Sequence, residues 1–228
     1  RIPLYVGTGH MEIDECVELS NYALDKGIRA VVVISPYYMN LPDSGILNFY
    51  GQAAQKIRGN IILYNFPART GYDLRPELVY ELVKRYPNII GLKDTVGDMG
   101  HTRAMIQKVK KDFTEFRIYS GFDEFFGHNA LSGGDGCIAG LSNFAPEVAA
   151  GYARAARQED LNGMCACQRK IDQLMAIYGV GQQFIQKKKK AMILRGMEME
   201  PFCAQPMLEA DERETEEIRK ILKQAELL

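Results

Sequence analysis

The chain has 228 residues, 46% of them hydrophobic and 25% charged, and its 28 basic and 29 acidic side chains leave a formal net charge of −1. This composition is typical of a globular protein with a sizeable core and excludes a disordered chain. The near-neutral charge balance argues against nucleic acid and anionic membrane surfaces as partners, so small molecules remain.

Six apolar, β-rich segments recur along the chain. They are, in order, IPLYVG (2–7), AVVVIS (30–35), NIILYNF (60–66), NIIGLKD (88–94), FRIYSG (116–121) and DGCIAGL (135–141). Their hydrophobicity is nearly continuous rather than alternating, which is typical of parallel strands that are buried on both faces.

The segments between these strands carry helical patterns. In the first, apolar residues at helical spacing follow Asp14 as a predicted N-cap, and Gly27 supplies the stop signal. In the second, an apolar stripe ends at Gly59, and in the third Pro76 stands where the first turn of a helix tolerates proline. Strands that alternate with helices predict right-handed βαβ crossovers and a parallel sheet.

Two parallel architectures fit this alternation. A doubly wound open sheet usually carries a nucleotide-binding fingerprint, but GTGHME (7–12) lacks the third glycine of that fingerprint, and GGDG (133–136) precedes a strand instead of opening a helix. Both glycine clusters are therefore interpreted as tight turns. The pattern favours a (β/α) barrel of the α/β class, although its six units are two fewer than those of a closed (β/α)8 TIM barrel.

From residue 146 onwards the chain has helical patterns only, at roughly 146–157, 160–178, 182–195 and 212–226. No linker rich in Pro, Gly or Ser precedes them. We therefore predict barrel units over residues 1–157 and a C-terminal helical extension over residues 158–228 that packs on the barrel. The KKKK run at 187–190 is interpreted as a solvated helical face.

Cysteine usage and hydropathy indicate the compartment. No stretch reaches the roughly 20 apolar residues of a membrane span, and the first residues lack the pattern of a secretion signal. The cysteine count is odd, which fits free thiols in a reduced compartment; the cysteines are Cys16, Cys137, Cys165, Cys167 and Cys203. We expect a cytoplasmic protein without a metal site or an organic cofactor, because a lone C-x-C and three scattered histidines do not match zinc spacing.

The polar residues at the strand ends are the candidates for chemistry, because reactive groups of parallel α/β barrels lie there. Tyr64 ends the third predicted strand and Lys93 the fourth. Sequential strands are neighbours at about 4.8 Å, so we expect these two side chains to lie close together. Arg69 follows in the FPARTG turn, and Asp123 with Glu124 follow the fifth strand.

This set of residues is suited to 2-keto acids. A poorly hydrated lysine amine can lose its proton and attack a ketone to form a Schiff base, which withdraws electrons from the adjacent C–C bond. We expect this role for Lys93, proton transfer by Tyr64 and carboxylate binding by Arg69. Each residue also has an ordinary explanation: a snorkelling lysine, a core tyrosine, a loop cation, and acids at a helix start.

Several motifs together resemble one family. They are GTG (7–9), SPYYMN (35–40), ILYNFPARTGYDL (62–74), NIIGLKDT (88–95), SGFDEFF (120–126) and LSGGDGCIAGLSNFAP (131–146). In order and spacing they resemble the dihydrodipicolinate synthase/N-acetylneuraminate lyase family of Schiff-base class I aldolases, from about residue 2 to 146. The helical tail resembles the C-terminal extension of that family.

The resemblance implies roles at matching positions. Lys93 resembles the Schiff-base lysine of the family and Tyr64 its catalytic tyrosine. Tyr38 resembles the catalytic tyrosine that reaches the site of a neighbouring subunit in a homotetramer built as a dimer of dimers. Arg69 resembles the arginine that the synthases use for the carboxylate of the aldehyde substrate. Ile138 falls where a backbone carbonyl faces bound pyruvate.

The subtype signals conflict. PARTGYDL looks like the synthases, whereas YNFPA, NIIGLKDT and NFAP look most like 2-keto-3-deoxy sugar acid aldolases. GFDE resembles the sialic acid lyases, which implies that Gly121, Asp123 and Glu124 bind the hydroxylated tail of a substrate. Family members begin with about two further βα units, including a Gly-Thr-Thr-Gly-Glu segment that the sequence as given lacks, so we expect a barrel that is N-terminally incomplete as given.

The resemblance therefore implies a pyruvate-dependent aldolase or lyase. We expect it to cleave or form a C–C bond in a 2-keto-3-deoxy acid, with pyruvate and an aldehyde as the small-molecule partners. One alternative is the synthase that condenses pyruvate with aspartate semialdehyde. A second alternative is a non-catalytic paralogue or fragment that binds keto acids.

Overall fold

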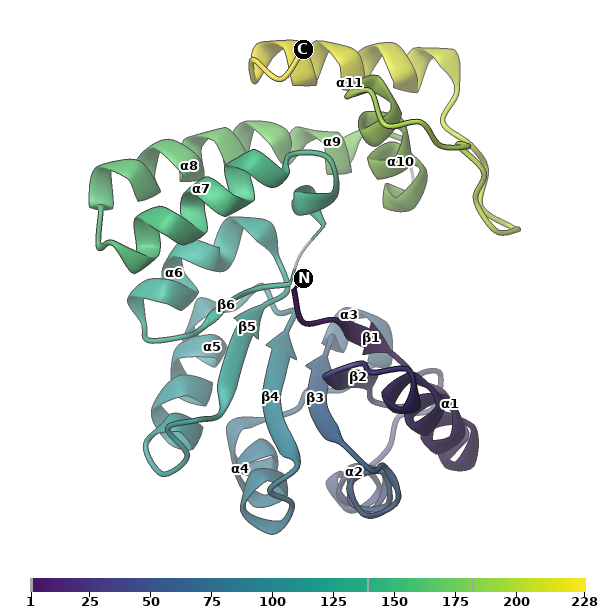
Figure 1. The fold of residues 1–228 in the computed structure, drawn as a ribbon, viewed down its shortest axis with the longest axis vertical. Coiled ribbons are helices and arrows are strands. Elements are labelled where there is room, and N and C mark those ends of the chain that lie inside the picture. Colours follow the sequence, from purple (N-terminus) through teal and green to yellow (C-terminus); the bar gives the residue numbers. More distant parts are fainter. Residues whose placement is uncertain (1, 139, 182) are drawn as a thin grey trace. The chain divides into compact units, whose positions relative to one another are not determined.

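The computed structural model describes residues 2–138, 140–181 and 183–228 (Figure 1). Its contacts divide the chain into two compact units, Arg1–Ile138 and Ala139–Leu228. Each unit is described by itself below. The predicted domain boundary between residues 157 and 158 stays a prediction.

The first unit is built on a parallel sheet. Its strands are β1 (Tyr5–Gly7), β2 (Ala30–Ile34), β3 (Asn60–Asn65), β4 (Ile89–Asp94), β5 (Arg117–Ser120) and β6 (Gly136–Cys137). Each strand pairs in parallel with the next one along the chain, so that spatial order equals sequence order. All six predicted strands are confirmed, and each is shorter than predicted.

Helices connect these strands and lie along one side of the curled sheet (Figure 1). They are α1 (Ile13–Asp25), α2 (Asp43–Lys56), α3 (Pro67–Thr70), α4 (Pro76–Arg85), α5 (Met99–Met105) with its π-helical continuation η1 (Ile106–Lys110), the 3₁₀ turn η2 (Asp123–Phe125), and α6 (Phe126–Leu131). This βα succession is a TIM-barrel type of α/β fold. Within the described residues it forms a half-barrel, with β1 and β6 at the edges of the sheet.

The core lies between the sheet and these helices. Val31 and Val33 of β2 and Leu63 of β3 are fully buried, and they belong to the same apolar cluster as Tyr50 of α2. Burying a side chain of this size stabilises the fold by roughly 1.5–3 kcal/mol. The Tyr50 hydroxyl donates to the Val33 carbonyl oxygen at 3.1 Å, so the one polar atom of that ring is also paired.

The helix ends agree with some of the predicted signals. Pro76 begins α4, and Gly27 follows α1 with a φ of 87°, which only glycine adopts without strain. The prediction of Asp14 as an N-cap is wrong, because Glu12 occupies that position and Asp14 lies in the first turn of α1. Its carboxylate pairs instead with Lys56 at 2.7 Å.

The second unit is helical. It contains η3 (Leu141–Asn143), α7 (Pro146–Arg157), α8 (Leu161–Leu174), α9 (Ala176–Gly179), α10 (Phe184–Leu194) and α11 (Glu212–Gln224). Helix α7 packs against α8, and α10 against α11. The helix predicted at 146–157 is confirmed, that at 160–178 is divided into α8 and α9, and that at 182–195 begins on residue 182, which lies outside the described residues.

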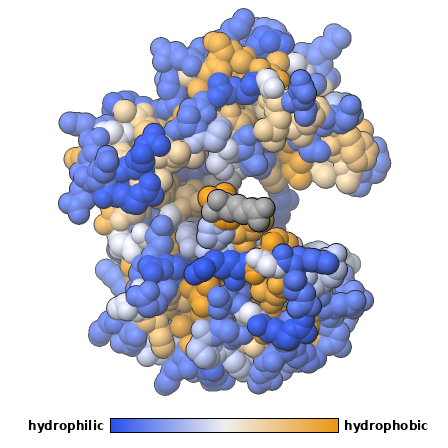
Figure 2. Space-filling model, viewed as in Figure 1, coloured by the Kyte–Doolittle hydropathy of each residue, from blue (hydrophilic) through white to orange (hydrophobic). Residues whose placement is uncertain are grey.

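Surface properties correct one further expectation. The Lys187 side chain, expected to be solvated, is only 1% exposed. Hydrophilic residues cover much of the face seen in Figure 2, and apolar residues appear between them. In the described part of the chain no helix is both long and apolar enough to span a bilayer.

Candidate active site

Tyr64 and Lys93 stand opposite each other where two neighbouring strands end. The register pairs Tyr64 of β3 with Lys93 of β4, and the next pair is Asn65 with Asp94. The ends of parallel strands meet at one edge of the sheet, where barrel enzymes place their reactive groups. The sequence-based expectation that these two side chains lie close together is confirmed.

The contact between them runs from the amine to the face of the ring. Lys93 Nζ lies 4.0 Å from the centroid of the Tyr64 ring, and both side chains are half-buried. A ring face attracts an ammonium group and limits the directions in which the lysine stem points. The amine is therefore held beside the phenol instead of extending into bulk solvent.

Aromatic rings continue from this pair towards Arg69. The ring of Phe66 stacks on that of Tyr64 with centroids 6.0 Å apart, and it meets Phe122 edge-to-face at 6.1 Å. The Arg69 guanidinium, on the short helix α3, lies 5.8 Å from the Phe66 centroid and is exposed. The Arg69 cation therefore lies at the outer end of a row of aromatic rings, and the inner end of this row is the Tyr64 ring beside Lys93.

The fifth and sixth strands bring further groups to the same edge. Burial raises the pKa of the Cys137 thiol to about 12, and a hydrogen bond with Ser120 opposes that rise. The side chains whose charges act on this thiol are Asp123, Lys93 and Glu124, so the two acids and the amine lie near one point of the edge. Asp123 is 9% exposed and begins η2.

The other predicted residues differ in their surroundings. A Cβ at Gly121 would lie 1.7 Å from Thr95 Oγ1, so this position requires glycine. The Ile138 amide donates to the Ser120 carbonyl oxygen at 2.9 Å and prolongs the pairing of β6 with β5. Tyr38, in contrast, is 92% exposed and is not brought to the Lys93 side chain.

Sequence reasoning missed a charged cluster behind the predicted site. His101 of α5 lies between two carboxylates, with Nδ1 3.0 Å from Asp94 Oδ2 and Nε2 3.0 Å from Asp73 Oδ2. Burial lowers the pKa of this imidazole, but the contacts with Asp73 and then Asp94 outweigh burial and raise that pKa to about 10. Burial also raises the pKa of Asp73, but the ion pair with His101 and the hydrogen bond from Asn65 bring that pKa below the ordinary value.

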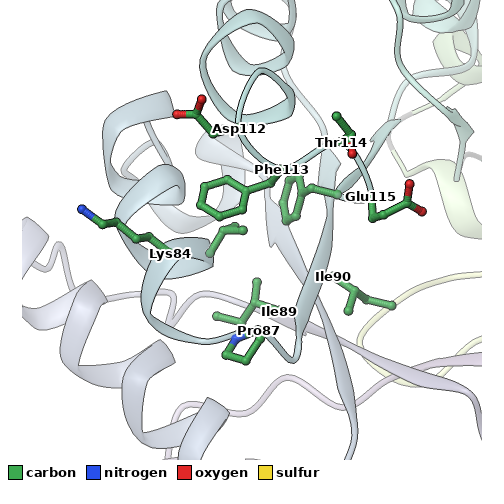
Figure 3. Close-up of a pocket in the computed structure, with 10 residues that line it drawn as sticks. Lys84, Pro87, Ile89, Ile90, Asp112, Phe113, Thr114 and Glu115 are labelled. Carbon is green, nitrogen blue, oxygen red and sulfur yellow. The ribbon is translucent and has the colours of Figure 1, made fainter.

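A cavity at the opposite ends of the strands contains none of the predicted site residues. It has a volume of about 490 Å³ and is lined by Val83, Lys84, Pro87, Ile89, Ile90, Asp112, Phe113, Thr114, Glu115 and Phe116. Ile89 begins β4, whereas Lys93 lies near its other end. Figure 3 shows Phe113 facing Pro87 and Ile89, with the charged ends of Lys84, Asp112 and Glu115 directed away. We interpret it as an apolar crevice between α4 and the start of β5.

The described residues contain no group of three or more His, Cys, Asp or Glu side chains placed to hold a metal ion. All five cysteines are free thiols.

Comparison with known proteins gives a match over nearly the whole chain. Residues 1–225 match the family described as the "Dihydrodipicolinate synthetase family". A probable 2-dehydro-3-deoxy-D-pentonate aldolase of Escherichia coli (strain K12), YjhH, is 37% identical over 222 residues, which are 97% of this chain and 74% of that protein. A 4-hydroxy-tetrahydrodipicolinate synthase of Kosmotoga olearia is 32% identical over 228 residues, 100% of this chain and 76% of the synthase.

The fold of this chain is also similar to that of a solved structure. The crystal structure of YagE, a prophage protein of the dihydrodipicolinic acid synthase family from E. coli K12 in complex with pyruvate, superimposes with a TM-score of 0.97 at 33% identity. The match covers 100% of this chain and 76% of YagE. Pyruvate is thus bound by a protein of the same fold.

Proposed function

The chain belongs to the dihydrodipicolinate synthetase family, and from this premise we propose that it is a pyruvate-dependent lyase in which Lys93 forms a Schiff base. The observation that carries the proposal is the position of the Lys93 amine, 4.0 Å from the Tyr64 ring at the adjoining ends of β3 and β4. An amine that is half-buried beside a phenol has both the nucleophile and the proton carrier that imine chemistry requires.

In the proposed reaction, the unprotonated Lys93 amine attacks C2 of the keto acid. The carbonyl oxygen takes up a proton while the nitrogen loses one, and a second proton on that oxygen lets it leave as water, which gives the iminium. We assign the transfer of these protons to the Tyr64 hydroxyl. The iminium attracts the electrons of the neighbouring bonds and so prepares the next step.

The iminium allows the C3–C4 bond of the substrate to be cleaved, because it can accept the electron pair of that bond. The hydroxyl on C4 loses its proton, the C3–C4 electron pair moves into a C2–C3 double bond and neutralises the iminium, and the aldehyde departs. Protonation of C3 and addition of water to C2 then release pyruvate and restore the amine. We assign the aldehyde-side contacts to Arg69 for a carboxylate and to Asp123 and Glu124 for hydroxyl groups.

The remaining contacts are part of the same proposal. Ile138 presents its backbone carbonyl to pyruvate. Gly121 contributes through its backbone, since Thr95 Oγ1 occupies the place that a side chain at this position would take. Tyr38 acts in the site of a neighbouring subunit of a homotetramer. In support, Tyr38 has a φ of 76°, a strained conformation that a non-glycine residue keeps mainly where function requires it, and its side chain is 92% exposed in the single chain.

We further infer that the sheet belongs to a closed (β/α)8 barrel and that the protein is cytoplasmic. A closed (β/α)8 barrel would have strands paired with both edges of this sheet, β1 and β6. A cytoplasmic location is supported by five free thiols, which a reducing compartment preserves.

Substrate choice within the lyases is the finer part of the proposal. We favour a 2-keto-3-deoxy sugar acid, because the aldolase relative has the higher identity of the two compared above and because the charges of Asp123 and Lys93 both act on the Cys137 thiol. The synthase that joins pyruvate to aspartate semialdehyde is the second candidate, supported by the synthase relative and by Arg69. Assaying the intact protein with both kinds of substrate separates them; turnover of aspartate semialdehyde alone would replace our preferred substrate class.

Borohydride trapping tests the Schiff base itself. Pyruvate and the reductant should leave one carboxyethyl group on Lys93 of the intact protein, located by peptide mass spectrometry. The Lys93→Ala variant should carry none, whereas Lys84→Ala, which removes an exposed lysine of α4, should be modified like the wild type. An unmodified wild type would point to the non-catalytic, keto-acid-binding alternative.

A further inference from the structure

The face of the sheet behind Tyr64 and Lys93 carries its own polar pair. Neighbouring residues of a strand point to opposite faces, so Asn65 and Asp94 point away from the proposed reaction face. Asn65 is 1% exposed and the Asp94 side chain is fully buried. The Asn65 side-chain amide donates to Asp94 Oδ1 at 2.9 Å, so this second pair is joined directly.

A buried carboxylate needs a partner of opposite charge, and His101 supplies it. Nδ1 of His101 forms a hydrogen-bonded ion pair with Asp94, and Thr102 Oγ1 donates to the same carboxylate at 3.2 Å. Nε2 of His101 faces Asp73 at 3.0 Å in an ion pair that is not aligned as a hydrogen bond. With a carboxylate at each nitrogen, the imidazole is most stable when both nitrogens carry a proton.

We propose that His101 is a positioning residue of the active site, and that its charged cluster with Asp73 and Asp94 fixes the end of β4 relative to the loop that carries Arg69. This inference rests on the proposed function. Asp94 follows Lys93 directly in β4, so a shift of its carboxylate moves the backbone that bears the amine. Asp73 lies four residues beyond Arg69, and Asn65 donates to its Oδ1 at 2.7 Å.

The cluster joins four parts of the first unit. Asn65 ends β3, Asp94 ends β4, His101 lies in α5, and Asp73 lies in the segment between α3 and α4. The Asn65 side-chain oxygen also accepts from the Leu74 amide at 3.0 Å, which holds the end of that segment. A misplacement of a reacting group by about 1 Å can lower the rate on the order of 100-fold. The cluster can therefore affect catalysis without touching the substrate.

Two further charged or titratable side chains near the cluster lie just before α4 and on α6. Arg75, immediately before α4, acts together with His101 to lower the pKa of Asp73. His128 of α6 contacts the carbonyl oxygen of the first residue of α5 at 3.0 Å. Asp73 and Asp94 remain the groups that raise the pKa of His101, so removing either of them must lower it.

The Asp73→Asn variant separates positioning from a merely structural role. The amide keeps the size of the side chain but removes one of the two charges that hold the proton on His101. The pKa of His101 should then fall from about 10 towards the ordinary histidine value of about 6.5. Proton NMR follows this directly, because the chain has only three histidines and His101→Asn identifies the signal.

Activity should follow the same titration. In Asp73→Asn, kcat/KM for a turned-over keto acid should fall by at least about tenfold as pH rises through the shifted value, since loss of the proton leaves Asp94 without its cation. Neither the wild type nor His101→Asn should show that inflection. His10→Asn, which changes an exposed histidine, is the matched control and should retain the wild-type profile.

The outcomes are distinct. An inflection in kcat/KM that coincides with the NMR titration of Asp73→Asn supports the proposal. A shifted histidine signal with an unchanged pH profile overturns it, as does a histidine signal that does not shift. If the wild type forms no borohydride adduct, the proposed function fails instead, and the titration of His101 is still measured independently. If His101→Asn does not fold, the signals that disappear in His10→Asn and in His128→Asn assign the third histidine signal to His101, so Asp73→Asn still carries the test.

Discussion

At the scale of single residues, the ring and the hydroxyl of Tyr64 have separate tasks in the proposed site. The ring lies beneath the Lys93 amine at 4.0 Å, and the hydroxyl is the proposed proton carrier. The Tyr64→Phe variant keeps the ring and removes only the hydroxyl. We expect kcat to fall by about 10²–10⁴-fold, the usual contribution of a positioned proton donor.

The trapping experiment supplies the second measurement for this variant. Lys93 of Tyr64→Phe should still form the pyruvate adduct, although more slowly, because the amine keeps its position on the ring. Tyr80→Phe is the control, since it removes a hydroxyl that binds Asp112 on the surface at 2.8 Å. Equal kcat values for Tyr64→Phe and the wild type would exclude proton transfer by this phenol.

The residues of the site differ in how far the sequence predicts them. The proximity of Tyr64 and Lys93 could be predicted, because each of them lies at the end of a strand and the two strands are parallel neighbours. His101 could not, since its partner Asp73 belongs to another connecting segment and the contact depends on tertiary packing. A signal was nevertheless present: if Lys93 faces the reaction, Asp94 must face the helices and needs a cation.

At the scale of elements, prediction is best where a pattern is long and its ends are marked. Helix α7 was predicted from its periodicity, and Pro76 fixed the start of α4. The 3₁₀ turn η2 and the π-helical η1 could not be predicted, because their hydrogen bonding departs from the 3.6-residue period of the α-helix. The expectation of a solvated Lys187 is wrong for a related reason, since four consecutive lysines lie on nearly every side of a helix, including the buried one.

Lys187 also gives a prediction for helix α10. Its Nζ is buried and, among the described residues, makes no hydrogen bond. Burial lowers the pKa of this amine, and Glu214 and Glu217 partly oppose that shift. The protonated amine therefore destabilises the folded state, and Lys187→Met should raise the free energy of unfolding by about 1 kcal/mol or more at neutral pH.

The pH dependence of this gain has a definite sign. Because the folded-state pKa lies below the unfolded one, the cost of Lys187 is fully present below the folded-state pKa and disappears as pH rises through the unfolded value of 10.5. The melting temperatures of the wild type and of Lys187→Met should thus converge at high pH. Lys223→Met in α11, at an exposed lysine, is the control, and an unchanged or lower melting temperature for Lys187→Met would contradict the prediction.

At the scale of the whole molecule, the order of the strands was predictable and the closure of the sheet was not. Sequential strands are usually neighbours, and right-handed crossovers that all proceed in one direction along the sheet make spatial order equal to sequence order. Closure depends on whether strands are available to pair with β1 and β6, which no local pattern in the six units specifies. Assembly is a similar property, because it depends on surfaces that one chain leaves exposed, such as Tyr38.

Subunit complementation tests the proposed role of Tyr38 in an assembly. Lys93→Ala chains keep Tyr38, and Tyr38→Ala chains keep Lys93, so neither should be active alone. If Tyr38 acts in the site of a neighbour, each mixed pair has one site with both residues and one with neither. Co-expression of equal amounts should therefore restore about a quarter of wild-type activity, because about half of the isologous pairs are mixed.

The matched control uses two residues of the same site. Lys93 and Tyr64 face each other within one chain, so every site of a mixture of Lys93→Ala and Tyr64→Phe chains lacks at least one of them. That mixture should stay at the level of its parents. If the Tyr38→Ala mixture behaves in the same way, Tyr38 does not act across a subunit boundary. If Tyr38→Ala is fully active alone, this tyrosine has no catalytic role, and its φ of 76° requires another cause.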